Sequence, residues 1–310
     1  SRSEPSFFEM RTAITALTEE LRRLKASGVT NVTISSDSLA RLQTVVSKRV
    51  DASGVALAKE TVPPTINPIA APSIKTPKKQ ETPKRALPDP PTVNLPEGDK
   101  QTRWAALREL VRKDETCLTQ LAPGKQLVFG VGDIDSKIMF VGEAPGADEE
   151  IKGEPFIGPA GQLLTKMISG MGLKREEAYI SNIMNWRPQL PNQAGSEQMG
   201  NRPPDAEEMA YCLPFLRAQI EVVAPQVIVA LGATAGRGLM GLDAFRTLGE
   251  VRGKWHEFAK TPLMVTYHPS YILRNKSNRS KRAIWEDLLQ VMERIQMPIT
   301  DKQRGYFLSG

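Results

Sequence analysis

Residues 137–146 have the sequence Lys137-Ile-Met-Phe-Val-Gly-Glu-Ala-Pro-Gly146, in which a short apolar run passes directly into a glycine-rich turn that carries an acid. An apolar run of this length, bounded by turn residues, is typical of a β-strand. The two glycines allow the backbone of the turn to approach a ligand closely. We therefore expect a strand whose carboxyl end carries a functional loop.

Strands and helices alternate on the carboxyl side of this stretch. The strands that we expect are 137–141, 178–182, 226–231 and 263–267, and the helices are 161–171, 205–223, 233–240 and 280–295. Such alternation favours parallel strands that helices cover on both faces. The sequence therefore predicts an α/β fold, a three-layer αβα sandwich around a mainly parallel four-stranded sheet.

The first hundred residues differ from the rest. Residues 1–58 are expected to form a small helical element, because apolar residues recur at helical spacing, at Phe7, Met10, Ile14, Leu17, Leu21 and Leu24. Residues 59–98 are expected to form a flexible, disordered linker rich in proline and lysine. The main domain would then span 99–297, followed by a C-terminal tail at 298–310. The apolar stripe either binds a protein partner or forms a marginal helix without one, and the sequence leaves both open.

Three polar side chains follow the expected strands. Glu143 comes after the first strand, Asn182 ends the second and His268 follows the fourth. Ligands of open α/β sheets bind at the carboxyl ends of the strands, so we expect these side chains to meet at one rim. Singly, they have structural explanations, as a solvated acid, a turn former and a structural histidine. Their convergence favours a functional site.

Several classes of protein are excluded by what the sequence lacks. It has no Gly-x-Gly-x-x-Gly fingerprint after a strand and no Walker A motif, which argues against nicotinamide and P-loop enzymes. It has no run of about 18 apolar residues and no apolar signal core near residue 1. We therefore expect no membrane association and a cytoplasmic setting. Cys117 and Cys212 are too few for a disulfide framework or, unaided, a metal cluster.

The basic residues are unevenly distributed. The net charge is +6, and residues 252–282 contain eight Lys or Arg against one acid, Glu257. This excess predicts a phosphate-binding surface. The alternative is a solvated loop and helix start.

Three ordered motifs resemble those of a known family. The first is Gly142-Glu-Ala-Pro-Gly146 with Gly153-Glu-Pro-Phe-Ile-Gly-Pro-Ala-Gly161. The second is Asn182-Ile-Met-Asn-Trp-Arg-Pro188 with Asn201-Arg-Pro-Pro204, and the third is Tyr267-His-Pro-Ser-Tyr-Ile-Leu-Arg274. Together they resemble the uracil-DNA glycosylase superfamily, most closely its family 4, the iron–sulfur type.

The resemblance covers roughly residues 115–295 and implies a monofunctional uracil-DNA glycosylase. Such an enzyme flips uracil out of DNA and hydrolyses its N-glycosidic bond, which initiates base excision repair. We accordingly expect uracil-containing DNA as the partner, a monomer, and a location at the bacterial nucleoid.

The resemblance also implies roles for single residues. The implied catalytic residues are Glu143, which would position water and stabilise the sugar cation, Glu149, a second acidic candidate, and His268, which would hydrogen-bond the uracil O2. The implied substrate-binding residues are Gly142, Ala144, Gly146, Phe156, which would stack on the base, and Asn182, which would bind its edge. The implied DNA-binding residues are Arg282 and a minor-groove loop formed by Pro269, Ser270, Tyr271, Ile272, Leu273 and Arg274.

The chain departs from family 4 in its cysteines. That family implies four cysteine ligands, but here Cys212 matches only the last, Cys117 lies near the first pair without its partner, and Trp186 occupies the third position. We therefore expect no iron–sulfur cluster and no other cofactor. The insert at 189–199 lacks the histidine that one branch of the superfamily uses to trap DNA covalently, so we expect turnover.

Two other functions stay open from the sequence. One is a glycosylase of the same fold that acts on another damaged or modified base. The other is a catalytically weak DNA-binding protein that recruits a partner through its N-terminal helix.

Overall fold

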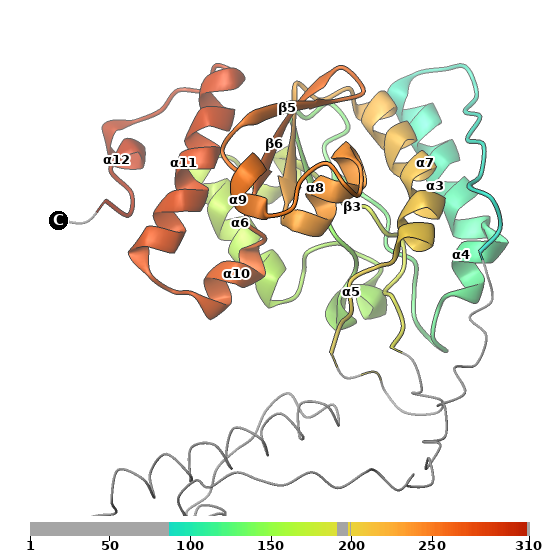
Figure 1. Ribbon diagram of the computed structural model, residues 1–310. Coiled ribbons are helices and arrows are strands. Elements are labelled where there is room, and N and C mark those ends of the chain that lie inside the picture. Colours follow the sequence, from blue (N-terminus) through green and yellow to red (C-terminus); the bar gives the residue numbers. More distant parts are fainter. Residues whose placement is uncertain (1–86, 191–197, 199, 309–310) are drawn as a thin grey trace, which may run out of the picture. The chain divides into compact units, whose positions relative to one another are not determined.

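The computed structural model describes residues 87–190, 198 and 200–308 (Figure 1). The expected helix near the N-terminus, most of the proline-rich linker and most of the insert at 189–199 lie outside the described residues. No helix in the described part of the chain is long and apolar enough to cross a membrane.

A six-stranded sheet forms the centre of the main domain, in the order β1-β3-β2-β4-β6-β5. The strands are β1 (Val131–Gly132), β2 (Ile138–Gly142), β3 (Tyr179–Asn182), β4 (Val227–Leu231), β5 (Trp255–Phe258) and β6 (Thr261–Thr266). Strands β3, β2, β4 and β6 pair in parallel, and β1 and β5 are antiparallel edge strands. The α/β class is confirmed, and the predicted strand number of four is wrong.

The two strands that the sequence did not predict are both at the edges. Strand β1 has only two residues, which is too short to leave a periodic pattern. Strand β5 contains His256 and Glu257, and only Phe258 is fully buried. It returns into β6 through Ala259 and Lys260, which both have positive φ, at 48° and 68°.

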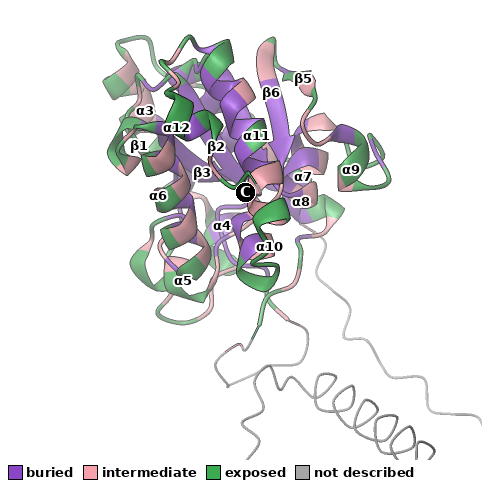
Figure 2. Cartoon of the chain, turned by 90° about the vertical axis from the view of Figure 1, so that its left-hand side faces the viewer, coloured by how far each residue is buried: buried purple, intermediate pink, exposed green. Residues whose placement is uncertain are grey.

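Helices cover both faces of the sheet. The helices of the described residues are α3 (Lys100–Lys113), α4 (Glu115–Thr119), α5 (Ala147–Lys152), α6 (Pro159–Met171), the 3₁₀ turn η1 (Arg175–Glu177), α7 (Ala206–Val223), α8 (Ala233–Met240), α9 (Leu248–Val251), α10 (Pro269–Arg274), α11 (Asn278–Arg294) and α12 (Asp301–Arg304). One core cluster joins the sheet to α3, α7 and α8, and the other joins it to α6 and α11. Figure 2 shows the central strands β2 and β3 and most of β6 buried between these layers.

The alternation of side chains along β2 explains the two clusters. Met139 and Val141 belong to the cluster under α3, α7 and α8, whereas Ile138 and Phe140 belong to the cluster under α6 and α11. Successive side chains of a strand point to opposite faces, so an unbroken apolar run fits a strand with a helical layer on each side. The three-layer sandwich follows from this pattern.

Both ends of the described domain pack on its core. In the last part of the predicted linker, Leu87, Val93 and Leu95 pack against the α3/α7/α8 cluster. In the segment predicted as a tail, the Trp285 indole donates to the Gln303 carbonyl at 2.6 Å. The packed chain therefore extends beyond residues 99–297 in both directions.

Truncation of Ile228 in the central strand β4 should destabilise the protein. Ile228 is 0% exposed, so Ile228→Ala should lower the free energy of unfolding by about 2–5 kcal/mol. Ile151 on α5 is 47% exposed, and Ile151→Ala should change it by less than about 0.5 kcal/mol. Urea unfolding of the two variants checks this, and equal losses would contradict a central position for β4.

Candidate active site

A cavity of about 550 Å³ opens at the carboxyl ends of the parallel strands. Glu143 after β2, Asn182 at the end of β3 and His268 after β6 all line it. Ala144, Gly146, Glu149, Phe156, Ser270 and Arg274 line it as well. Helices α5 and α10 lie at this end of the domain (Figure 1). The structure therefore brings together the side chains that the sequence placed after separate strands.

Gly142 contributes to the site because it has no side chain. It pairs with Asn182 across β2 and β3, but it does not line the cavity. A Cβ atom at Gly142 would lie 2.4 Å from both Asn182 Oδ1 and Phe156 Cζ. The absent side chain thus leaves the space that the amide and the aromatic ring occupy, and both of these line the cavity.

Phe156 is held in a strained conformation. Its φ is +54°, which non-glycine residues rarely adopt, and such strain costs about 1–3 kcal/mol and concentrates at functional sites. The ring is 6% exposed, and its centroid lies 5.7 Å from that of His268. A Cβ at Gly161 would lie 1.8 Å from the Phe156 carbonyl oxygen, so α6 approaches this turn too closely for a side chain.

Glu149 ties the two halves of the first motif together. Its Oε1 accepts hydrogen bonds from the N–H groups of Ile157 and Gly158, at 3.1 and 3.0 Å. Its Oε2 accepts from the N–H of Gly146 at 3.0 Å. These three bonds fix the turn that carries Phe156 against the start of α5.

Asn182 has an unsatisfied polar atom. Its side chain is 4% exposed, and its Oδ1 has no hydrogen-bond partner among the described residues. Leaving a buried acceptor unpaired costs about 1–3 kcal/mol. Because Asn182 lines the cavity, a ligand with an N–H group can supply the missing donor.

His268 is a neutral hydrogen-bond donor. Burial, and secondarily the positive charge of Arg274, lowers its pKa to about 4, so the ring is uncharged at pH 7. The N–H of Ser270 donates to His268 Nδ1 at 3.2 Å, so Nδ1 is the acceptor. The ring proton therefore lies on Nε2.

Glu143 is the cavity carboxylate with the clearest electrostatic perturbation. Burial raises its pKa above the ordinary value, against the opposing effect of a hydrogen bond from Thr234. Thr234 lies on the first turn of α8, after Gly232. A Cβ at Gly232 would lie 3.1 Å from the His268 Cβ, so the turn after β4 packs directly against the histidine.

The segment predicted as a DNA-binding loop is the helix α10. His268 is its N-cap and Pro269 its first residue, a position that favours helix initiation. Pro269 and Ile272 are buried, and Leu273 is 39% exposed. Only the outer face of α10 is therefore open to a ligand.

Two further residues of that prediction have internal contacts. Tyr271 stacks on Tyr267 with ring centroids 4.3 Å apart. Arg282 pairs with Glu286 at 2.9 Å and donates to the carbonyl groups of Arg304 and Tyr306. The exposed cations of this stretch are instead Arg274, which lines the cavity, and Lys276 and Arg279, which follow it in the sequence.

The sequence did not single out four residues of the site. Thr234 contacts Glu143, and Asp148, Asn201 and Arg202 line the cavity. Arg202 pairs with the buried Glu208 at 2.6 Å, and Asn201 Oδ1 accepts from Arg187 at 2.8 Å. Asn201 and Arg202 lie within the second motif and Asp148 lies between the two halves of the first, which was the available signal, whereas Thr234 lies outside all three motifs.

The residues present do not fit a four-cysteine cluster. The whole chain has two cysteines, both buried, and a hydrogen bond to Cys212 together with burial raises the pKa of the Cys117 thiol. A protonated thiol is a poor metal ligand. Trp186 is 1% exposed in the same core cluster, with its ring centroid 6.2 Å from that of Tyr211.

Comparison with known proteins agrees with this site. Residues 129–289 match the model of the uracil DNA glycosylase superfamily. A type-4 uracil-DNA glycosylase of Thermotoga maritima is 41% identical over 181 residues, which is 58% of this chain and 88% of that protein. Those of Archaeoglobus fulgidus and Pyrobaculum aerophilum are 43% and 38% identical, over 47% and 56% of this chain and 71% and 87% of theirs.

The matched residues include every strand of the sheet and the strand ends that form the cavity. Glu143, Phe156, Asn182 and His268 all fall within them. The chain therefore belongs to the uracil-DNA glycosylase superfamily, and its relatives include the type-4 enzymes.

Proposed function

We propose that this protein is a monofunctional uracil-DNA glycosylase, which flips uracil out of DNA and hydrolyses its N-glycosidic bond as the first step of base excision repair. The observation that carries the proposal is Asn182, whose buried amide oxygen faces no donor among the described residues and lies beside the Phe156 ring. The names of the type-4 relatives support uracil as the base.

Asn182 would select uracil by its hydrogen-bonding edge. Uracil presents an N3–H donor beside the O4 acceptor, and an asparagine amide matches this pair with Oδ1 and Nδ2. Cytosine presents an unprotonated N3 and an amino group. Asn182 Oδ1 would then face the N3 acceptor, and Nδ2 would face the amino donor, so neither hydrogen bond could form. A site built to hydrogen-bond one pattern rejects the other because its buried groups would stay unpaired.

His268 and Glu143 would stabilise the two charges that develop as the bond breaks. The departing base becomes negative, and the neutral His268 ring would donate from Nε2 to the uracil O2. A preformed donor of this kind stabilises the transition state more than the ground state. The sugar becomes positive, and the Glu143 carboxylate would stabilise it and orient the attacking water.

Access to the cavity would require the base to leave the DNA stack. A base inside a duplex is unreachable for such a pocket, and extrusion costs a few kcal/mol. Stacking on an aromatic side chain, here Phe156, recovers about 1–3 kcal/mol. The exposed Leu273 on α10 would fill the gap in the helix, and Arg274, Lys276 and Arg279 would contact phosphates.

Hydrolysis would proceed without a Schiff-base intermediate and without an iron–sulfur cluster. Of the described residues that line the cavity, none is a lysine, so the site offers no amine for a Schiff base. We infer that the enzyme acts without an iron–sulfur cluster, since its two cysteines cannot ligate one. Monomeric action, location at the nucleoid and a partner for the N-terminal helix stay predictions.

Removal of either base contact should slow uracil release. We expect Asn182→Ala and His268→Ala to lower the release rate from a labelled uracil oligonucleotide at least about tenfold, equivalent to about 1.4 kcal/mol in the barrier. The matched controls are Asn278→Ala, at an exposed position of α11, and His256→Ala, whose ring contacts the Val251 carbonyl outside the cavity. Absence of release by folded parent protein from single- and double-stranded DNA would exclude uracil as the substrate.

The ionisation of His268 gives a direct test of its role. The chain has only two histidines, so their ring signals can be followed by NMR, with His268→Ala assigning them. We expect His268 to titrate near pH 4 with its proton on Nε2, because burial disfavours the charged ring. The His268 ring should therefore stay neutral as pH falls through 6.5. Titration near 6.5 would contradict the donor role.

The product should be an intact abasic site. After complete uracil release, the DNA strand should break only on alkali treatment, and borohydride should trap no protein–DNA adduct. Both results follow because no lysine is found among the described residues that line the cavity. A borohydride-dependent adduct would establish a lyase instead of a monofunctional hydrolase.

A further inference from the structure

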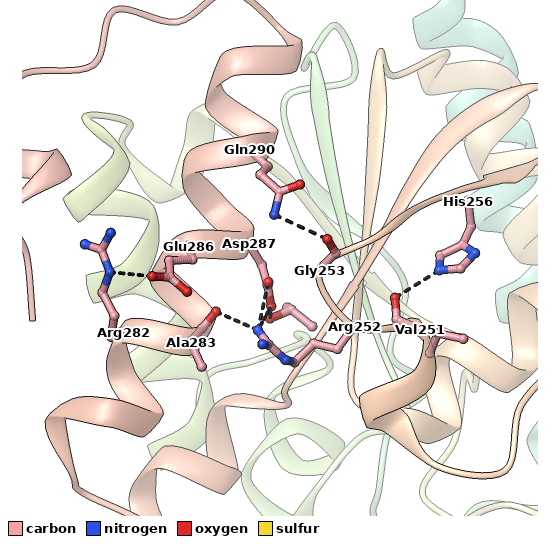
Figure 3. Close-up of polar contacts among 10 residues, drawn as sticks. Val251, Arg252, Gly253, His256, Arg282, Ala283, Glu286, Asp287 and Gln290 are labelled. Carbon is pink, nitrogen blue, oxygen red and sulfur yellow. Dashed lines mark hydrogen bonds and ion pairs between the residues drawn. The ribbon is translucent and has the colours of Figure 1, made fainter. Parts of the chain in front are cut away.

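A buried carboxylate that does not line the cavity lies close to residues 266–268, the segment that ends in His268. It is Asp287 on α11, whose contacts Figure 3 shows. Asp287 is 1% exposed. The Arg252 Nη1 lies 2.8 Å from both of its oxygens, and the Thr266 hydroxyl donates to Oδ2 at 2.5 Å. The proposed chemistry at Glu143 and His268 makes no use of this group.

Arg252 carries the contact from Asp287 to the aromatic pair beside the site. Its guanidinium lies over the Tyr267 ring, 5.2 Å from the centroid, and Tyr267 stacks on Tyr271 with an interplanar angle of 12°. A guanidinium over an aromatic face is an attractive contact. Asp287 therefore fixes the residue before His268 through Arg252.

Thr266 carries a second contact to the same segment. It is the last residue of β6 and is fully buried. Its side chain binds Asp287, and its carbonyl accepts from the N–H of Gly232 at 2.9 Å. Both residues that precede His268 are thus linked to one carboxylate, one directly and one through Arg252.

The turn that presents Arg252 is shaped to approach Asp287. Gly253 has a φ of +69°, and a Cβ there would lie 2.9 Å from Asp287 Oδ1. Figure 3 shows the Gln290 amide donating to the Gly253 carbonyl. This hydrogen bond is 3.3 Å long. The N–H of Gly253 donates to the Val265 carbonyl at 3.2 Å. The turn is therefore held between α11 and β6.

Stability alone is a weak reason for such a pair. Well-packed apolar residues often replace a buried ion pair without loss of stability, whereas ion pairs can specify one geometry. We propose that Asp287 and Arg252 are positioning residues for the glycosylase reaction, because they hold Thr266 and Tyr267 and thereby aim the His268 ring and α10 at the substrate. This inference rests on the proposed function.

The charge of Asp287 should therefore matter for the rate. Burial raises the pKa of Asp287 to about 6, against the lowering effects of Thr266 and Arg252, and the Glu286 charge adds to the rise. As pH falls through about 6, Asp287 gains a proton and Arg252 loses its ionic partner. The rate of uracil release by the parent enzyme should therefore fall in this range. A variant without the Asp287 carboxylate should not show this decrease.

The test is Asp287→Asn, which keeps an oxygen for Thr266 and removes the charge that holds Arg252. We expect kcat for uracil release to fall about tenfold with KM within about twofold. Tyr267→Leu, which removes the ring under Arg252, should have a similar effect. The double variant should be no slower than the slower single variant, because both act through Arg252. Glu293→Gln, an exposed carboxylate of the same helix, is the matched control.

NMR titration of His268 separates positioning from general destabilisation. In folded Asp287→Asn protein the His268 pKa should rise from about 4 toward 6.5, as the ring loses its buried placement, and it should not move in Glu293→Gln. Parent-like kcat, additive effects of the two substitutions, or an unchanged His268 pKa would each overturn the proposal. This titration needs no uracil release, so failure of the proposed activity would be seen separately in the parent enzyme.

Discussion

The register between β2 and β3 places a residue without a side chain opposite the residue that faces the ligand. Gly142 pairs with Asn182, and its missing Cβ leaves the space that the Asn182 amide and the Phe156 ring occupy. A shift of one residue in this pairing would turn one of the two strands over relative to the two core clusters. The apolar faces of β2 therefore fix the site as well as the fold.

Backbone strain and buried polar atoms without hydrogen-bond partners are concentrated around this contact. Phe156 has a positive φ. Among residues 87–190, 198 and 200–308, three of the four buried side-chain polar atoms without a partner belong to the stretch 182–186, in Asn182, Asn185 and Trp186. Each such atom costs about 1–3 kcal/mol. The Asn182 oxygen lines the cavity, so ligand binding can recover its cost. The Trp186 N–H lies in the core, where the ring fills volume without satisfying its polar atom.

The sequence predicted those parts of the fold and site that follow from local patterns. Unbroken apolar runs predicted the four parallel strands, and the strand-end rule placed Glu143, Asn182 and His268 together. The sequence did not predict β1, because two residues are too few for a periodic pattern. It also did not predict β5, because that strand depends on its pairing with β6. The role of Thr234 depends on where α8 begins, and the contacts of Arg282 depend on where the chain beyond α11 packs. Such tertiary contacts leave no local pattern.

The position of His268 shows why such distant contacts matter for the chemistry. A neutral donor needs a ring that is buried, oriented by an acceptor role at Nδ1, and kept away from acids that would favour its charged form. Ser270 sets the orientation, and burial with the nearby Arg274 sets the charge. The buried carboxylate behind this segment, Asp287, pairs with Arg252, accepts a hydrogen bond from Thr266 and is not among the groups that shift the pKa of the His268 ring. The pairing therefore lets an acid support the histidine segment without raising the affinity of the ring for a proton.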